Sequence, residues 1–210
     1  MIYEVRTYDL KPRTLPEVEK RFGEAYEKRK KYSELAAFWH TEIGPLNQVV
    51  QVWPYPDLEE RGRIRAAAVK DGAWPPPIGE FVVSMRSDIM IPFAISPELK
   101  PGRMGPYFEM RTYTYASGHL PRIMQLWEKA LPARLQFGPV CAAWYSELGG
   151  LNKFVHIWPY PSLEARSDTR KKAQAAGVWP PSAEKHGTPG YQLFIQENKI
   201  LMPASFSPLQ

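Results

Sequence analysis

Two carboxylate–guanidinium pairs stand at the same short spacing in this chain. Glu4 precedes Arg6 by two residues, and Glu109 precedes Arg111 by two residues. Because side chains alternate between the two sides of a strand, each pair would lie on one strand face. A guanidinium fork binds a carboxylate or a phosphate with two parallel hydrogen bonds, so an anion clamp is one interpretation. The other is a buried ion-pair network that fixes the register of the strands.

His156 is the strongest single candidate for proton transfer or for metal binding, since an imidazole titrates near neutral pH. The alternative is a hydrogen-bonded histidine in the protein interior. Haem ligation would require an axial histidine in a roomy apolar pocket. The other three histidines are scattered, and no spacing of His, Cys and carboxylate residues predicts a zinc or di-iron site. We therefore predict no metal site and no cofactor, with haem as the open alternative.

Aromatic side chains that could form the walls of a pocket recur along the chain. Core packing is their ordinary role, but an aromatic pocket with a few polar groups is also typical of a small-molecule site. Tyr8 and Tyr113 join His156 as candidates for proton transfer. The candidates for ligand contact, with two asparagines and two arginines among them, are Arg6, Trp39, Asn47, Trp53, Arg111, Trp144, Asn152 and Trp158.

The composition is that of an ordinary globular protein, with 44% hydrophobic and 23% charged residues among 210. No apolar run approaches the ~20 residues that cross a bilayer, so we expect no membrane contact. Met1 leads directly into a strand-like alternation without a signal region, and we expect a cytoplasmic protein. The lone Cys141 cannot form an internal disulfide and lies in an apolar stretch, which favours a buried structural thiol.

The net charge of +5 is partly concentrated in two basic runs, Lys28–Lys31 and Arg170–Lys172. Both lie on predicted helices, where a solvated helix face is the ordinary interpretation. Nucleic-acid binding would require a basic stripe with interleaved aromatics or a known module, and the sequence has neither. P-loop, dinucleotide-binding and nucleophile-elbow motifs are also absent. We therefore predict a small-molecule ligand and no nucleic-acid partner.

The elements that must position these residues occur twice. Shifted by ~105 residues, the sequence aligns with itself without a gap over ~75 residues. Glu4–Tyr8 falls on Glu109–Tyr113, and Leu46–Pro56 falls on Leu151–Pro161. A short insertion follows around residues 183–188, after which the register returns. We therefore predict a tandem duplication, with a first unit over residues 1–97 and a second over residues 107–210.

Each copy predicts the element order βαββαβ, which is the ferredoxin-like split unit. In the first copy, hydrophobic periodicity and turn residues predict strands over 2–8, 35–43, 46–53 and 81–91 and helices over 15–29 and 58–69. Asp57 and Ser162 are the predicted N-caps of the second helix in each copy. Pro132 falls inside the first helix of the second copy, so we expect a kink or break there.

Two such units predict an α+β fold in which the open faces of the two sheets pack together as an α/β barrel. Strand parity separates an aliphatic face from a polar and aromatic face, and we expect the aliphatic face to meet the helices. The barrel could form within one chain or between chains, and we expect a homo-oligomer. The lumen would then hold the polar set, Glu4, Arg6, Tyr8, Asn47, Gln51 and Trp53 with Glu109, Arg111, Tyr113, Asn152, His156 and Trp158.

The repeated motifs resemble the NIPSNAP family. They are Glu4–Tyr8, Glu42–Gln48, Val52–Tyr55 and Trp74–Pro76, and the second half repeats the set with Glu147–Lys153. The resemblance covers nearly the whole chain, once per half. It implies a dimeric α+β barrel fold, related to small monooxygenases of the antibiotic-biosynthesis type and to haem-degrading proteins. It implies no settled catalytic residues.

Three functions remain open at this point. The first is a NIPSNAP-type protein that binds a small, partly apolar ligand in the lumen or between sheet and helix. The second is a cofactor-free or haem-dependent monooxygenase, in which Tyr8, Trp39, Asn47, Arg111 and His156 position the substrate and handle protons. The third is an interaction module whose basic helices bind a protein partner.

Overall fold

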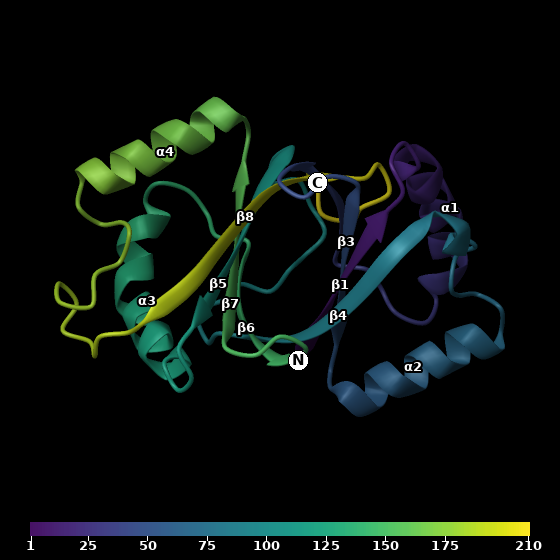
Figure 1. Cartoon of the computed structure of the whole chain (residues 1–210), viewed down its shortest axis with the longest axis horizontal. Helices are drawn as coiled ribbons and strands as arrows, with labels where there is room; N and C mark the ends of the chain where they lie inside the picture. Colours follow the sequence, from purple (N-terminus) through teal and green to yellow (C-terminus); the bar gives the residue numbers. More distant parts are fainter.

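The computed structural model describes residues 1–210, which form eight strands and four α-helices (Figure 1). The first half consists of β1 (Ile2–Leu10), α1 (Leu15–Arg29), β2 (Ala37–Ile43), β3 (Gln48–Tyr55), α2 (Leu58–Lys70), the short 3-10 helix η1 (Gly79–Phe81) and β4 (Val82–Pro92). The second half consists of β5 (Tyr107–Tyr115), α3 (Leu120–Leu135), β6 (Ala142–Leu148), β7 (Lys153–Tyr160), α4 (Leu163–Ala175) and β8 (Leu193–Pro203). The order βαββαβ therefore occurs twice, as the sequence predicts.

The eight strands close into one barrel, in the order β1-β3-β2-β8-β5-β7-β6-β4. Two antiparallel pairings join the halves, β2 with β8 and β4 with β6. In these seams Trp39 lies opposite Pro203, and Pro92 lies opposite Trp144. The barrel therefore closes within a single chain, which answers the question that the sequence left open. The expected homo-oligomer stays a prediction.

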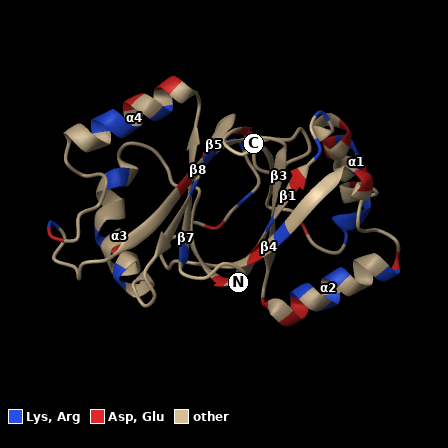
Figure 2. Cartoon of the chain, viewed as in Figure 1, with Lys and Arg blue, Asp and Glu red and all other residues tan.

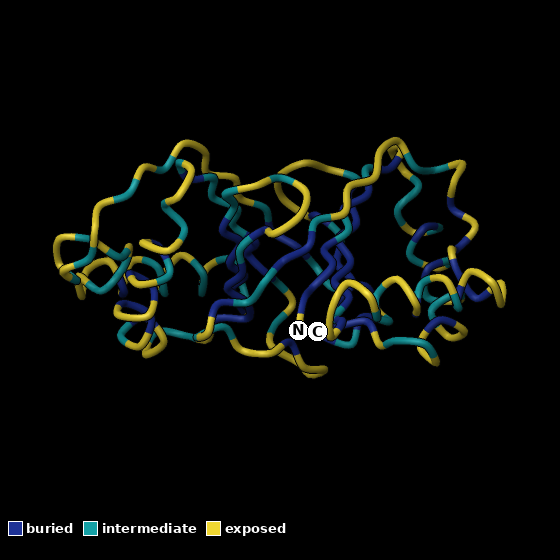
Figure 3. The backbone as a smooth tube through the Cα atoms, turned by 90° about the horizontal axis from the view of Figure 1, so that it is seen from below, coloured by how far each residue is buried: buried dark blue, intermediate teal, exposed yellow.

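The helices cover the outside of the barrel on two opposite sides. In Figure 1, α1 and α2 flank the first-half strands on one side, and α3 and α4 flank the second-half strands on the other. Figure 3 shows buried residues concentrated along the central strands, with exposed residues on the helices and connectors at both extremities. No helix is both long enough and apolar enough to span a membrane.

The assignment of strand faces from the sequence is wrong. The barrel interior holds the aliphatic face, in one cluster that takes Val5 and Val52 from the first half and Met110 and Ile157 from the second. An eight-stranded barrel has an interior just wide enough for side chains, or for one small ligand, and apolar residues fill most of it here. The polar and aromatic face lies against the helices instead, where Glu4 contacts Arg61 of α2.

Several local expectations can be compared with the structure. The Asp57 carboxylate accepts a hydrogen bond from the Glu60 N–H at 2.8 Å, and the Ser162 hydroxyl accepts one from Ala165 at 3.0 Å, so both N-caps are confirmed. The predicted break at Pro132 does not occur, because α3 continues through it to Leu135. Cys141 is buried as predicted, and burial raises the pKa of its thiol to about 12.

Candidate functional site

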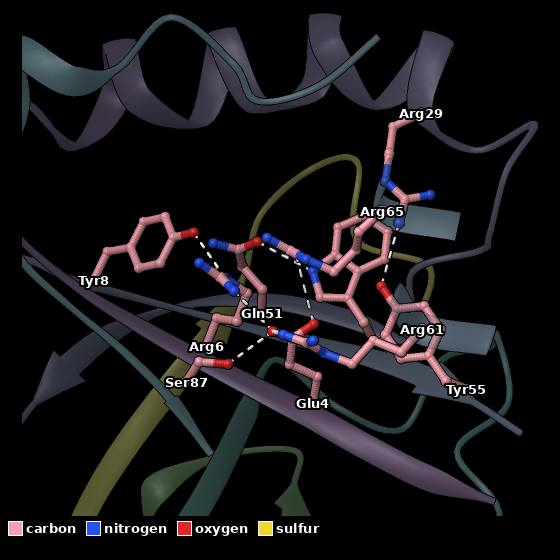
Figure 4. Close-up of polar contacts among 10 residues, drawn as sticks. Glu4, Arg6, Tyr8, Arg29, Gln51, Tyr55, Arg61, Arg65 and Ser87 are labelled. Atoms are coloured by element: carbon pink, nitrogen blue, oxygen red, sulfur yellow. Dashed lines mark hydrogen bonds and ion pairs between the residues drawn. The ribbon is translucent and has the colours of Figure 1, made fainter. Parts of the chain in front are cut away.

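A buried carboxylate surrounded by arginines lies between sheet and helices in the first half (Figure 4). One oxygen of Glu4 accepts hydrogen bonds from Arg6 at 2.7 Å, from Arg61 at 2.6 Å and from Ser87 at 2.7 Å. Arg65 lies 3.6 Å from the other oxygen. Burial alone would raise the pKa of the Glu4 carboxyl, but these hydrogen bonds and charges lower it to about 2. The carboxylate is therefore ionised at neutral pH.

The second half repeats this arrangement at the equivalent positions. Glu109 accepts hydrogen bonds from Arg111 at 2.9 Å and from Arg166 at 2.6 Å, and Arg170 lies 3.8 Å from its other oxygen. The pKa of the Glu109 carboxyl is likewise lowered, by these arginines against the effect of burial. The two-residue spacing of glutamate and arginine thus forms a buried ion-pair network, and the helices complete it. Figure 2 shows the Lys and Arg residues along α2 and α4.

A fourth arginine, from the first helix of each half, completes each cluster. Arg29 of α1 is buried, donates to the Tyr55 hydroxyl at 3.2 Å and lies 4.8 Å from the Trp53 ring centroid. Arg134 of α3 is also buried and lies 4.3 Å from the Trp158 ring centroid. We call the two sets the arginine clusters, Glu4, Arg6, Arg29, Arg61, Arg65 and Glu109, Arg111, Arg134, Arg166, Arg170. Each has an excess of positive charge.

The sequence interpretation missed three of the four arginines in each half. The run Lys28–Lys31 was expected to be a solvated helix face, but Arg29 within it points inward. Arg61 and Arg65 are one helical turn apart, so both reach the same carboxylate. A usable signal was present, because all three recur ~105 residues later, within the gapless part of the repeat.

His156 and its counterpart Gln51 occupy matching positions beside the arginine clusters. The Trp158 indole N–H donates to His156 Nδ1 at 2.7 Å, and the Trp53 indole N–H donates to Gln51 Oε1 at 3.1 Å. Because Nδ1 accepts, the proton of the neutral imidazole lies on Nε2. That Nε2 is buried and has no hydrogen-bond partner, and the same holds for the amide nitrogen of Gln51. Each half therefore presents a buried, unsatisfied N–H donor.

The environment keeps His156 neutral. Burial lowers the pKa of the imidazole well below its usual value, and the charges of Arg111, Arg170 and Arg134 lower it further. The His156 ring also packs against aromatic neighbours, 4.9 Å from Trp127 and 5.0 Å from Tyr113 between ring centroids. At neutral pH the residue is thus a hydrogen-bond donor in an aromatic setting.

The second half has a cavity in front of His156, between the sheet and α3. Its volume is about 90 Å³, and it shares four lining residues with a more open hollow of about 310 Å³, which Arg111 and Arg170 also line. We call the enclosed part the aromatic cavity. Its lining residues are Tyr113, Tyr115, Ile123, Leu126, Trp127, His156, Trp179, Pro180, Pro181, Tyr191, Leu193 and Gln196.

The connector before the last strand differs between the halves and explains part of this cavity. It has 11 residues between α2 and β4, but 17 between α4 and β8. In the first half, Ile78 and Phe81 of the short connector pack on the helix–sheet core. In the second half, the longer connector brings Tyr191 to the cavity wall.

The structure brings some of the predicted site residues together and separates others. Arg111, Tyr113, His156 and Trp158 lie together on the helix side of the second half, and Arg6, Tyr8 and Trp53 form the matching group in the first. Trp39 and Trp144 are instead barrel core, where Trp144 stacks on Tyr3 at 4.6 Å between centroids. Asn47 and Asn152 lie in turns, with φ of 57° and 56°. Left-handed backbone of this kind favours asparagine, which accounts for both residues without a ligand.

The family model that matches this sequence is NIPSNAP, and it matches twice, over residues 3–97 and 108–208. The chain belongs to the NIPSNAP family. Human NipSnap homolog 3A is 27% identical to it over 100% of this chain and 86% of the human protein. The NipSnap protein of Drosophila melanogaster is 24% identical over 100% of this chain and 79% of its own length.

The chain was also compared with solved structures. A proposed monooxygenase from Lactobacillus acidophilus aligns over 97% of this chain and 94% of its own, with a TM-score of 0.65 and 9% identity, which shows the fold alone. An uncharacterised NIPSNAP domain protein from Burkholderia xenovorans is 28% identical. The alignment covers 47% of this chain and 100% of that protein, at a TM-score of 0.45.

The aromatic cavity can be tested against haem, the cofactor that the sequence left open. Pockets for drug-sized ligands measure about 300–1,000 Å³, and the cavity in front of His156 measures about 90 Å³. A porphyrin does not fit the aromatic cavity as its side chains are arranged. No group of three or more His, Cys, Asp or Glu residues is placed to hold a metal ion.

Proposed function

We propose that this NIPSNAP protein binds a small organic anion with an apolar body, between the sheet and α3 of its second half. The observation that carries the proposal is the buried, unpartnered Nε2–H of His156, a residue that lines the aromatic cavity. A buried donor without a partner costs about 1–3 kcal/mol, and a ligand oxygen would recover that cost. The ligand therefore needs an acceptor atom near its apolar part.

The charge at the rim supports an anionic ligand. Arg111 and Arg170 line the open hollow beside the aromatic cavity, and the cluster around Glu109 has more arginines than carboxylates. A carboxylate held by a guanidinium is stabilised by charge-assisted hydrogen bonds. We place the anionic group of the ligand at these two side chains.

The size of the aromatic cavity limits the apolar body of the ligand. An engineered apolar cavity of ~150 Å³ holds benzene. This cavity is smaller, at about 90 Å³, but it shares lining residues with the larger hollow. We therefore propose an apolar body no larger than a short aliphatic chain, or a single ring that lies partly in the hollow. Benzoate is therefore a suitable first probe.

The geometry supports binding better than proton abstraction. A general base needs a free lone pair, but the Nδ1 lone pair of His156 accepts from Trp158 and the Nε2 atom carries the proton. Tyr113 accepts from Arg111 Nε at 2.7 Å, which holds the phenol in place at the rim. The fold supports the monooxygenase hypothesis. The arrangement of these side chains does not favour it over binding.

The test compares matched arginine variants of the two halves. Benzoate affinity is measured by isothermal titration calorimetry for the wild type, for Arg170→Met and for Arg65→Met, which occupies the same position in the first half. A lost charge-assisted hydrogen bond costs about 1.5–3 kcal/mol, so Arg170→Met should weaken binding at least tenfold. Arg65→Met should leave the affinity unchanged.

Controls separate charge from shape. Benzyl alcohol, which lacks the charge, and acetate, which lacks the ring, should both bind more weakly than benzoate. The proposal is wrong if benzoate does not bind the wild type, or if both arginine variants weaken it equally.

A further inference from the structure

A second, larger cavity lies at the end of the barrel nearest the β2–β3 and β6–β7 turns. It measures about 320 Å³ and takes its walls from both halves. We call it the barrel mouth. Its lining residues are Val5, Thr7, Pro45, Gln48, Arg86, Asp88, Met90, Met110, Thr112, Lys153, Val155, Glu197, Asn198 and Lys199. The aromatic cavity shares none of them.

Five charged side chains line the barrel mouth, Arg86, Asp88, Lys153, Glu197 and Lys199. None of the five forms an ion pair within 4.0 Å. Their hydrogen bonds are to neutral groups: Asp88 accepts from the Gly150 N–H at 3.1 Å, and Lys199 donates to Gln48 Oε1 at 3.3 Å. Charges of both signs therefore face the same space without neutralising one another.

The internal repeat shows that this charge pattern has diverged between the halves. β4 and β8 align so that Arg86 corresponds to Glu197 and Asp88 corresponds to Lys199. Each wall of the barrel mouth thus carries one group of each sign, with the order reversed. Groups of opposite sign on β4 and β8 could form ion pairs across the mouth. They stay apart instead and leave a cavity between them.

The environment of Lys199 indicates that its ammonium group lacks a counter-ion. Burial lowers the pKa of this amine to about 8, and the nearby charge of Arg86 contributes to the shift. Glu197, Asp9 and Asp88 act in the opposite direction without overcoming it. A carboxylate placed between Lys199 and Arg86 would stabilise both cations.

We propose that the barrel mouth binds a small zwitterion, a molecule with one carboxylate and one ammonium group, as in a free amino acid. Its carboxylate lies at Arg86 and Lys199, and its ammonium lies at Asp88 and Glu197. The volume of about 320 Å³ is at the lower end of the range for small-molecule pockets, ~300–1,000 Å³. This ligand differs in charge and in place from the organic anion proposed for the second half.

The experiment uses a series in which the distance between the two charges grows. Glycine, β-alanine and 4-aminobutanoate are titrated into the protein by calorimetry, with butanoate and butylamine as probes that carry one charge each. At least one zwitterion should bind tenfold more tightly than either single-charge probe. The proposal is overturned if no zwitterion binds, or if butanoate or butylamine binds as tightly as the best zwitterion.

Variants locate the zwitterion. Asp88→Asn keeps an oxygen for the Gly150 N–H but removes the charge, and Lys199→Met removes the ammonium; each should weaken binding of the best zwitterion at least tenfold. Arg63→Met is the matched control, since Arg63 is exposed on α2 and pairs with Glu60. Near-UV circular dichroism confirms that each variant is folded. Binding that survives both mouth variants would overturn the placement.

The same titrations separate the two proposed ligands. Arg170→Met should weaken benzoate and leave the zwitterion unaffected, and Asp88→Asn should do the reverse. Either site can therefore fail without the other.

Discussion

The two halves of the barrel share a buried arginine cluster and differ in what lies beside it. Around Glu4 and Glu109 the same side chains recur at matching positions, down to the tyrosine that accepts from the strand arginine. The neighbouring space has diverged, because the second half has a longer connector and an enclosed aromatic cavity. The repeated clusters therefore have a structural role in both halves, and the diverged space beside the second cluster is where the two halves can differ in function.

The largest effect should come from removing the shared carboxylate. Glu4→Gln leaves several arginines without their buried counter-charge, which costs about 3–5 kcal/mol of stability. Glu109→Gln should cost less, because Glu109 accepts two hydrogen bonds from charged side chains whereas Glu4 also accepts one from Ser87. Urea unfolding of both variants measures the difference. Equal and small costs would show that the clusters are not structural.

Acid should lower the free energy of unfolding through the Glu4 carboxyl of the first half. The folded-state pKa of Glu4 is lowered from 4.5 to about 2, so its contribution is present above pH ~4.5 and is lost as the pH falls through the folded value. A shift of this size corresponds to about 3 kcal/mol. Unfolding free energies between pH 2 and 5 should fall more steeply in the wild type than in Glu4→Gln. Parallel curves would contradict the assignment.

A smaller effect is expected from exchanging the aromatic residues that differ between the halves. Trp127 of α3 contacts His156 and Trp179, and Phe22 stands at the matching position of α1. Trp127→Phe should cost about 1–2 kcal/mol from lost apolar burial and enlarge the aromatic cavity. Phe22→Trp should cost about 1–3 kcal/mol by overpacking. If Phe22→Trp were instead neutral, the first half would have unfilled space, and the contrast between the halves would be weaker.

The smallest effect concerns the pH dependence that His156 adds to the second half. Its pKa is lowered in the folded state, so its contribution is present above the unfolded value near 6.5 and is lost as the pH falls below it. His156→Gln copies the first half, keeps an acceptor for Trp158 and should flatten stability between pH 5 and 7 relative to the wild type. The pKa of His40 is raised by Glu19, so its effect on stability has the opposite pH dependence. His40 is present in both proteins, so the difference between their pH profiles reports on His156 alone. An unchanged slope would mean that His156 is not held neutral.

The sequence predicts the order of the elements because both copies carry the same turn and strand signals, and the barrel follows from two incomplete sheets. It does not predict which strand face turns inward. Alternation places Val5 and Arg6 on opposite strand faces. Which face meets the helices depends on the side chains that α2 and α4 supply. The sequence prediction did not include Arg61 and Arg65 among them. The continuation of α3 past Pro132 likewise depends on tertiary packing, since its neighbour Leu131 is buried in the core.

The chemistry of the site was predicted only in part. His156, Tyr113 and Arg111 were selected from residue type and spacing, and the structure brings them together. The aromatic cavity itself could not be predicted, because it depends on how the longer connector places Tyr191 against Trp179 and its neighbours. The barrel mouth could not be predicted either, because it combines side chains of β4 and β8 with Val5, which was assigned to the helix-facing side.

The claim that the halves share a structure but differ in binding is tested most directly by two indole signals. Trp53 donates to Gln51 and Trp158 donates to His156 at matching positions. Their N–H resonances are followed in ¹H–¹⁵N spectra during a benzoate titration, with assignment by single Trp→Phe variants. We predict that the Trp158 signal shifts with saturation while the Trp53 signal stays in place. Equal shifts of both signals, or a shift of Trp53 alone, would contradict the account.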